Sequence, residues 1–151
     1  MRPSVLLTLV SLALAGCYSG ENVVHELGVR IVRFPNGHKV TAEVMQAPED
    51  LGRGMMFRKS LPEGRGMLFL HAQPGPYTYW MYNVEIPLDI IFMDQNQRIV
   101  HVERNAQPCR KPARECPSYG PDPPRLVQYI LELGGGQAER YALKPGDTLR
   151  F

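Results

Sequence analysis

Alternating apolar and polar residues identify the first two predicted strands. Apolar side chains at alternate positions of residues 38–45 give the period of two that is typical of a half-buried strand. Asn36 and Gly37 stand immediately before this segment, and both residue types accept the positive φ angles of a tight hairpin turn. We therefore expect residues 29–34 to pair antiparallel with residues 38–45.

A short helix is predicted after this hairpin. Pro48 suits the first turn of a helix, and Glu49 and Asp50 place negative charge at the positive end of the helix dipole. Gly52 and Gly54 follow at once, and glycine is costly inside a helix. The helix is therefore expected to end within a few residues.

Apolar runs separated by turn residues predict the remaining strands, which are residues 66–70, 77–82, 86–93, 99–103, 126–133 and 148–151. Six prolines between 108 and 124 exclude a helix or a central strand and predict an ordered loop. Residues 137–142 could form about one helical turn. About eight short strands without long alternating helices predict a mainly β fold. We expect a compact antiparallel sandwich or barrel with one or two short helices.

The composition narrows the class of protein. A chain of 151 residues with 44% hydrophobic and 21% charged residues is expected to fold as a single soluble domain. Its 14 glycines and 14 prolines are unfavourable for a helical bundle. The net charge of +2 is far below the basic excess typical of nucleic-acid-binding domains, so no nucleic-acid partner is expected.

The N-terminal segment predicts export and lipid anchoring. Residues 1–16 contain an apolar run too short to span a bilayer but suited to a signal peptide. The run ends in Leu-Ala-Gly before Cys17, which resembles the bacterial lipobox, although an ordinary signal peptide is the alternative. Tyr18, and not Asp, follows Cys17, and the resemblance to the sorting patterns of Gram-negative lipoproteins implies the outer membrane. We expect lipidated Cys17 and a tether over 17–28, a β domain over 29–151, and a periplasmic location in the bacterial cell envelope.

Two cysteines remain for the folded domain. Cys109 and Cys116 are an even number in an oxidising compartment, which favours a disulfide. The short loop that such a bond closes corresponds to about 2.5 kcal/mol of stabilisation in the chain-entropy account. A redox-active thiol pair is the alternative, but the two-residue spacing typical of such pairs is missing.

Familiar motifs for cofactors and catalysis are missing from the sequence. It contains no Gly-rich phosphate loop, Gly-x-Ser-x-Gly, His-Glu-x-x-His or Cys-x-x-Cys, so no cofactor is expected. Methionines, together with His38 and His101, raise the alternative of Cu(I) binding. Because methionine also fills irregular cores and no Met-x-x-Met spacing recurs, we expect no metal site.

Asp89 is the most unusual residue of the predicted domain, because it lies within the apolar run 86–92. A carboxylate without a partner in such a place costs several kcal/mol. Strand alternation directs Asp89 to the face opposite Leu88 and Ile90. Arg53 and Arg58 are candidate partners, since a guanidinium can hold a carboxylate through two hydrogen bonds. The pair is either structural or part of a polar pocket that receives a ligand.

Trp80, the only tryptophan, lies in an aromatic segment over 77–82. Its ring is suited to stacking on a sugar or another cyclic ligand, and packing in an aromatic core is the alternative. Asn83 ends the segment and either hydrogen-bonds a ligand at a pocket rim or caps the next turn.

Several motifs together resemble one family, the domain of unknown function 192 family. They are Arg53-Gly54-Met55-Met56-Phe57-Arg58, Gly66-Met67-Leu68-Phe69, Trp80-Met81-Tyr82-Asn83, Ile86-Pro87-Leu88-Asp89-Ile90-Ile91-Phe92, the segment 109–119 and the closing Lys144-Pro145-Gly146-Asp147 turn. The resemblance covers about residues 29–151 and implies a small, mainly β domain without an assigned activity. It implies importance for Arg53, Arg58, Trp80, Asn83 and Asp89. This chain departs from the pattern in having Tyr82 where related sequences commonly have a basic residue.

These observations favour a membrane-anchored extracytoplasmic binding or accessory module for a cell-wall or small-molecule ligand. The alternative is an enzyme acting on envelope carbohydrate or peptide, with Asp89 as acid or base. A glycosidase requires a second carboxylate, and Glu85 is the only nearby acid. A purely structural envelope protein is the third hypothesis.

Overall fold

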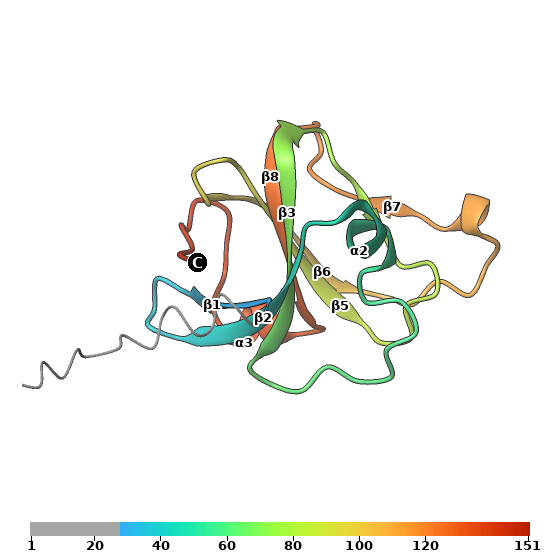
Figure 1. Ribbon diagram of the computed structural model, residues 1–151, viewed down its shortest axis with the longest axis horizontal. Helices are drawn as coiled ribbons and strands as arrows, with labels where there is room; N and C mark the ends of the chain where they lie inside the picture. The colour runs from blue at the N-terminus through green and yellow to red at the C-terminus, as the bar shows by residue number, and fades with distance from the viewer. Residues whose placement is uncertain (1–27) are drawn as a thin grey trace, which may run out of the picture.

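The computed structural model describes residues 28–151, which form two sheets and short helical segments (Figure 1). The six-stranded sheet has the order β1 (Val29–Arg33), β2 (Lys39–Met45), β3 (Arg65–Gly75), β8 (Val127–Gly134), β5 (Leu88–Met93) and β6 (Ile99–Ala106). The second sheet pairs β4 (Tyr79–Trp80) with β7 (Ser118–Tyr119), and the helical segments are α2 (Pro48–Arg53), the 3-10 turn η1 (Ala113–Glu115) and α3 (Gln137–Arg140). The predicted signal peptide, Cys17 and nearly all of the predicted tether lie outside these residues. None of the described helices has the length and apolar character needed to cross a bilayer.

The mainly β class, the number of about eight strands and the two short α-helices are confirmed. The eighth strand is β7 and not the predicted strand over 148–151, and β7 and η1 lie in the proline-rich segment that was predicted to be a loop. The large sheet is mixed, because β2 and β3 run parallel while its other neighbouring strands are antiparallel. A parallel pair requires a long crossover, and residues 46–64, which include α2, supply it. In the described part of the chain β1 and β6 remain the two edges of the large sheet, so the sandwich-like alternative applies.

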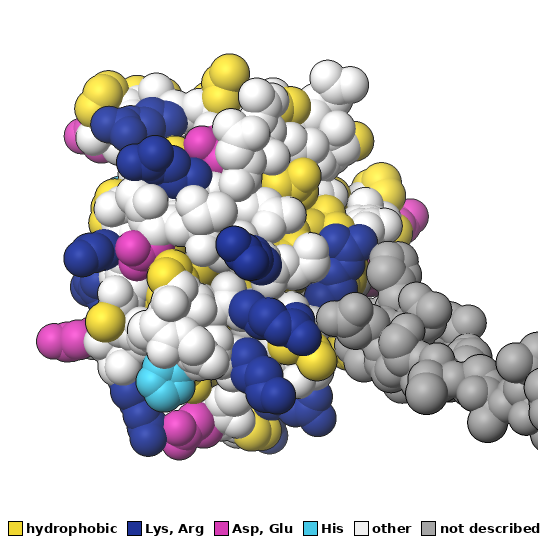
Figure 2. All heavy atoms as spheres, turned by 90° about the vertical axis from the view of Figure 1, so that its left-hand side faces the viewer, with side chains coloured by type: hydrophobic (Ala, Val, Ile, Leu, Met, Phe, Trp, Pro, Cys, Tyr) yellow, Lys and Arg dark blue, Asp and Glu magenta, His cyan; other side chains and the backbone are white. Residues whose placement is uncertain are grey.

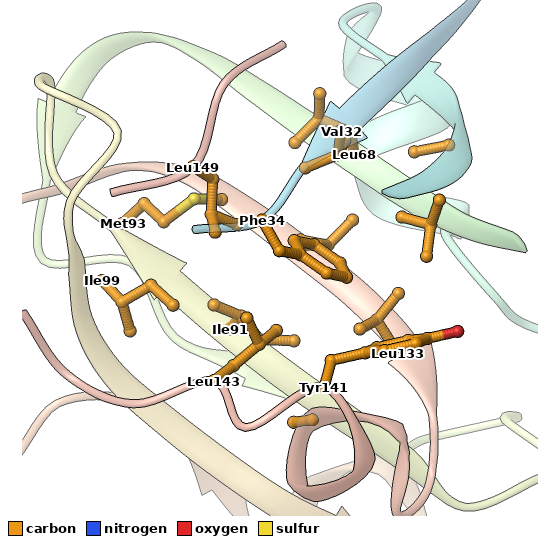
Figure 3. Close-up of a cluster of buried hydrophobic side chains, with 14 residues drawn as sticks. Val32, Phe34, Leu68, Ile91, Met93, Ile99, Leu133, Tyr141, Leu143 and Leu149 are labelled. Atoms are coloured by element: carbon orange, nitrogen blue, oxygen red, sulfur yellow. The ribbon is translucent and has the colours of Figure 1, made fainter. Parts of the chain in front are cut away.

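The large sheet is buried on both faces. Side chains alternate between the faces along a strand, so Leu131 and Leu133 of β8 face one core while Ile130 faces the other. The first, the C-terminal core (Figure 3), contains Val32, Phe34, Val40, Ala42, Leu68, Ile91, Met93, Ile99, Leu131, Leu133, Ala138, Tyr141, Leu143 and Leu149. The second, the α2-side core, contains Met55, Met67, Phe69, Met81, Val84, Leu88, Ile90, Phe92, Ala106, Val127 and Ile130. The predicted alternation along residues 88–93 is therefore confirmed.

The C-terminal segment differs from its prediction. Residues 148–151 form two isolated bridges, Arg33 with Arg150 and Arg98 with Thr148, in place of a continuous strand. Its backbone hydrogen bonds join it to Arg33 of β1 on one side and to Gln97, in the turn before β6, on the other. Leu149, between the bridging residues, is buried in the C-terminal core.

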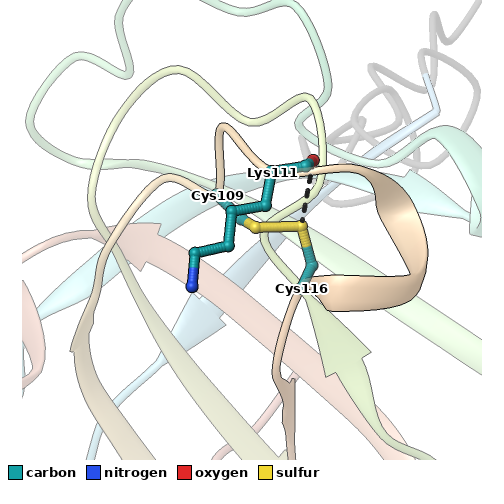
Figure 4. The surroundings of a disulfide bond; sticks show 3 residues. All are labelled: Cys109, Lys111 and Cys116. Carbon is teal, nitrogen blue, oxygen red and sulfur yellow. Dashed lines mark hydrogen bonds between the residues drawn. A yellow bond between two sulfur atoms is a disulfide. The ribbon is translucent and has the colours of Figure 1, made fainter.

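The predicted disulfide is present, with Cys109 and Cys116 joined by an S–S bond of 2.02 Å (Figure 4). The Cys116 sulfur lies 3.7 Å from the Lys111 carbonyl oxygen. The bridged loop is attached to the segment that carries Trp80, because the Cys109 amide donates to the Met81 carbonyl at 3.1 Å. Pairing of β4 with β7 adds a second attachment. The disulfide thus braces the two-stranded sheet that presents Trp80.

Candidate functional site

Asp89 is fully buried, and its partners are backbone amides. Its Oδ1 accepts a hydrogen bond from the Asn105 amide at 2.7 Å, and its Oδ2 accepts one from the Ala138 amide at 2.6 Å. The expected pairing with Arg53 or Arg58 is wrong, because Asp89 faces the C-terminal core while both arginines lie with α2 on the other side of the sheet. Asp89 therefore fastens β6 and the start of α3 to β5.

Arg58 is paired with Glu43 of β2. The Arg58 Nη1 and Nη2 atoms donate to the two carboxylate oxygens of Glu43 at 2.7 and 2.6 Å. These hydrogen bonds lower the pKa of Glu43 and raise that of Arg58. The two side chains are 37% and 43% exposed, so the pair contributes about 1 kcal/mol or less to stability. The pair engages both Nη atoms of the Arg58 guanidinium.

Glu132 of β8 is the other buried acid of the described residues, and it is only 4% exposed. Its cross-strand partners are Met67 and Ile90, so it faces the α2-side core. The Oε2 atom has no hydrogen-bond partner within the described part of the chain. Burial raises the pKa of Glu132 to about 8, although the Arg58 charge opposes this effect. The carboxyl group is therefore largely protonated at neutral pH.

A cavity of about 30 Å³ adjoins Glu132, and we call it the Glu132 cavity. Its lining combines the end of α2 and the following loop with side chains from β3, β4 and β8: Leu51, Gly52, Arg53, Gly54, Met55, Met56, Phe69, Tyr79, Trp80, Val84 and Glu132. Arg53 is exposed and Trp80 is 40% exposed, so both form its rim. This volume accommodates one group of the size of a water molecule. The cavity can thus admit the tip of a ligand.

Gly54 allows the end of α2 to lie against the cavity. Its φ of 45° is in the region that side chains disfavour. A Cβ at this position would come within 3.1 Å of the Phe69 ring and 3.9 Å of the Glu132 Oε2. The small residue therefore keeps space open above the carboxyl group.

Aromatic rings form much of the wall beside Glu132. The rings of Phe69 and Tyr79 meet edge to face, with centroids 4.9 Å apart. The Tyr79 hydroxyl lies 3.2 Å from the His71 Nε2. Burial is the first cause that raises the pKa of Tyr79, and the charge of Glu132 adds to it, while burial lowers the pKa of His71. Neutral rings thus surround the acid.

Asn83 supports a turn beside the cavity and is not among its lining residues. Its carbonyl oxygen accepts a hydrogen bond from the Phe57 amide at 2.8 Å. Both residues have positive φ angles, 58° and 63°, which are uncommon for residues other than glycine. The Phe57 ring is 60% exposed. This contact fixes the loop after α2 against the segment that follows Trp80.

The expected site residues therefore do not all converge. Arg53 and Trp80 line one cavity, whereas Arg58 is held by Glu43 and Asp89 lies on the opposite face of the sheet. Sequence reasoning missed Glu132. The signal was available, because Glu132 interrupts the apolar run 130–133 in the way that Asp89 interrupts its own run.

The described residues provide no cluster of three or more His, Cys, Asp or Glu side chains that could hold a metal ion. Methionines serve as core filler, because Met55 and Met81 are buried in the α2-side core and Met93 in the C-terminal core. His38 is exposed on the hairpin and its ring packs near Tyr141.

Comparisons with known proteins confirm the family resemblance. The profile of DUF192, described as "Uncharacterized ACR, COG1430", matches residues 31–151. A crystal structure of a protein of unknown function from Novosphingobium aromaticivorans DSM 12444 has a TM-score of 0.72 and 32% identity, covering 82% of this chain and 85% of that one. A putative transcription regulator from Sinorhizobium meliloti 1021 has a TM-score of 0.72 and 29% identity, covering 81% and 92%. A comparison with curated proteins gives no match. The chain belongs to the DUF192 family of uncharacterised proteins.

Proposed function

We propose that this chain is a lipid-anchored binding module of the bacterial cell envelope whose ligand inserts a polar group into the Glu132 cavity. The observation that carries the proposal is the buried Oε2 of Glu132, which has no hydrogen-bond partner among the described residues. A buried acceptor without a partner costs about 1–3 kcal/mol. A ligand that satisfies it recovers this free energy on binding.

The lining of the Glu132 cavity favours a ligand with a small donor group next to a ring or an apolar body. Space of about 30 Å³ suits a hydroxyl or an ammonium group. Trp80 at the rim offers a ring face for stacking, and Arg53 adds a charged donor. Sugars and short peptides of the cell wall have this combination of groups, so they are the proposed ligands.

Anchoring is the second part of the proposal. It is supported by the lipobox-like sequence that ends in Cys17 and by the disulfide between Cys109 and Cys116, which is typical of an oxidising compartment. In a Gram-negative host we expect the chain to lie on the periplasmic side of the outer membrane. Cell fractionation tests this part, because a Cys17→Ala chain should leave the membrane fraction.

The enzymatic alternative with Asp89 as acid or base receives no support from the contacts of that residue. Both Asp89 oxygens already accept backbone amide hydrogen bonds, and the side chain is fully buried. A group engaged in this way is suited to holding elements together. No contact in the described residues favours a catalytic role for it.

The binding proposal is tested by the fluorescence of Trp80, the only tryptophan. The protein is titrated with N-acetylglucosamine and with the dipeptide D-alanyl-D-alanine, and the same titrations are made with Glu132→Gln. We expect a change in emission with at least one probe, and a loss of affinity of about two- to tenfold in the variant, since a hydrogen bond between neutral groups contributes about 0.5–1.5 kcal/mol.

Glu85→Gln is the matched control, because it makes the same chemical change at an exposed position. It should bind as the unaltered protein does. Equal affinity of the unaltered protein and Glu132→Gln would refute a role for Glu132 in binding. Lack of a response to either probe would contradict the proposed class of ligand.

A further inference from the structure

Three basic residues lie opposite one another on three adjacent segments, which are β1, β2 and the C-terminal segment. Arg33 of β1 is paired with Lys39 of β2 on one side and with Arg150 on the other. All three are exposed. Like charges at opposed positions destabilise a sheet, so folding alone gives no reason for this arrangement.

Arg98 extends the same row. It bridges Thr148, which lies two residues before Arg150 and therefore projects from the same face of the segment. Leu149 between them points into the C-terminal core. We call Lys39, Arg33, Arg150 and Arg98 the basic ladder. Figure 2, which faces this side of the molecule, shows Lys and Arg side chains following one another down the middle of the surface.

Three residues of the basic ladder have no acidic partner in the part of the chain that the structure describes. Lys39, Arg98 and Arg150 take part in none of the ion pairs within residues 28–151. Asp94 accepts hydrogen bonds from the amides of Asn96 and Arg98, and Asp147 accepts one from the Lys144 amide. Both carboxylates thus hydrogen-bond to the turns in which they lie, and Lys39, Arg98 and Arg150 remain exposed positive charges.

We propose that the basic ladder docks the domain on an anionic lipid surface, an inference that extends the proposed anchoring through Cys17 but does not use the Glu132 cavity. The position of the predicted tether supports it. The tether would join the domain at Val29, the first residue of the strand that ends at Arg33, a distance of about 13 Å at about 3.3 Å per residue. Basic residues close to an anionic membrane each strengthen binding.

Docking by the basic ladder would also orient the candidate site. In Figure 1, β1 and the C-terminus lie on one side of the molecule, while α2 and β7 lie on the other. The Glu132 cavity is formed by the end of α2 and by β4, the partner of β7. A domain held by its basic ladder therefore turns the cavity away from the lipid, toward soluble or wall-borne ligands.

Sedimentation with vesicles tests the inference on the chain from residue 18, which contains both cores and lacks Cys17. The related crystal structures are covered over 85% and 92% of their chains by this unit, which shows that it forms an independent fold. The vesicles are phosphatidylcholine alone and an equal mixture of phosphatidylcholine and phosphatidylglycerol. We compare Lys39→Glu/Arg98→Glu/Arg150→Glu with the control Arg110→Glu/Lys111→Glu/Arg125→Glu, which makes the same change in net charge on the proline-rich loop.

We expect binding to the phosphatidylglycerol vesicles that weakens with salt, and a loss of about tenfold or more in the ladder variant. The control variant should keep most of its binding. Equal losses in the two variants, or equal binding to both kinds of vesicle, would overturn the inference. Binding to a soluble polyphosphate without binding to vesicles would also overturn it and would indicate an anionic polymer as the partner. Circular dichroism establishes that each variant is folded.

Discussion

Glu132→Gln should make the protein more stable at alkaline pH. The pKa of Glu132 is raised by burial from 4.5 to about 8. Between these values the folded state holds a proton that the unfolded state has released, so the free energy of unfolding falls as pH rises. At about 1.4 kcal/mol per pH unit, the loss reaches about 5 kcal/mol above pH 8. Glutamine has nearly the same shape and does not ionise, so the variant escapes this loss.

Urea denaturation from pH 5 to pH 9, followed by circular dichroism, measures the effect. The unaltered protein and Glu132→Gln should have similar stability near pH 5 and diverge as pH rises, with the variant more stable at pH 9. Glu85→Gln, at an exposed position, should follow the unaltered protein. Parallel curves for the unaltered protein and Glu132→Gln would refute the inference that burial keeps this carboxyl group protonated.

Two further variants test the contributions of the Asp89 hydrogen bonds and of the disulfide to stability. Asp89→Asn should lower the free energy of unfolding by about 3 kcal/mol, because one backbone amide then faces an NH₂ group in place of a carboxylate oxygen. If the stability is unchanged and ligand binding is altered, Asp89 is a site residue. Cys109→Ser/Cys116→Ser should cost about 2.5 kcal/mol through loss of the closed loop, and the Trp80 emission should shift to longer wavelength as β4 and β7 loosen. An unshifted emission would contradict the bracing role of the disulfide.

Features that depend on a few neighbouring residues were predictable from the sequence. Asn36 and Gly37 encode the hairpin turn between β1 and β2 (Gly37 has a φ of 86°). Pro48 begins α2 as expected. The disulfide was predicted from the even number of cysteines that remain after Cys17 and from the expected export of the chain. In each case a few neighbouring residues determine the structure, so no knowledge of distant contacts was needed.

Long-range features were not predictable in the same way. The parallel pairing of β2 with β3 depends on how the crossover packs, which no short pattern encodes. The predicted arginine partner of Asp89 was wrong because the prediction considered only side chains, whereas in the structure two backbone amides donate to the carboxylate. Glu132 interrupts the apolar run of β8, but because β8 is buried on both faces, the run alone does not reveal that this residue faces a cavity.

Direct contact between the ligand and Glu132 is the central claim of the proposed function. The most direct test is the ¹³C chemical shift of the Glu132 carboxyl carbon, measured by NMR as the probe that alters Trp80 emission is added. We predict a progressive change at Glu132 and none at the carboxyl carbon of Asp89, which lies on the opposite face of the sheet. A Trp80 response with an unchanged Glu132 signal would contradict the claim and would place the ligand outside the Glu132 cavity.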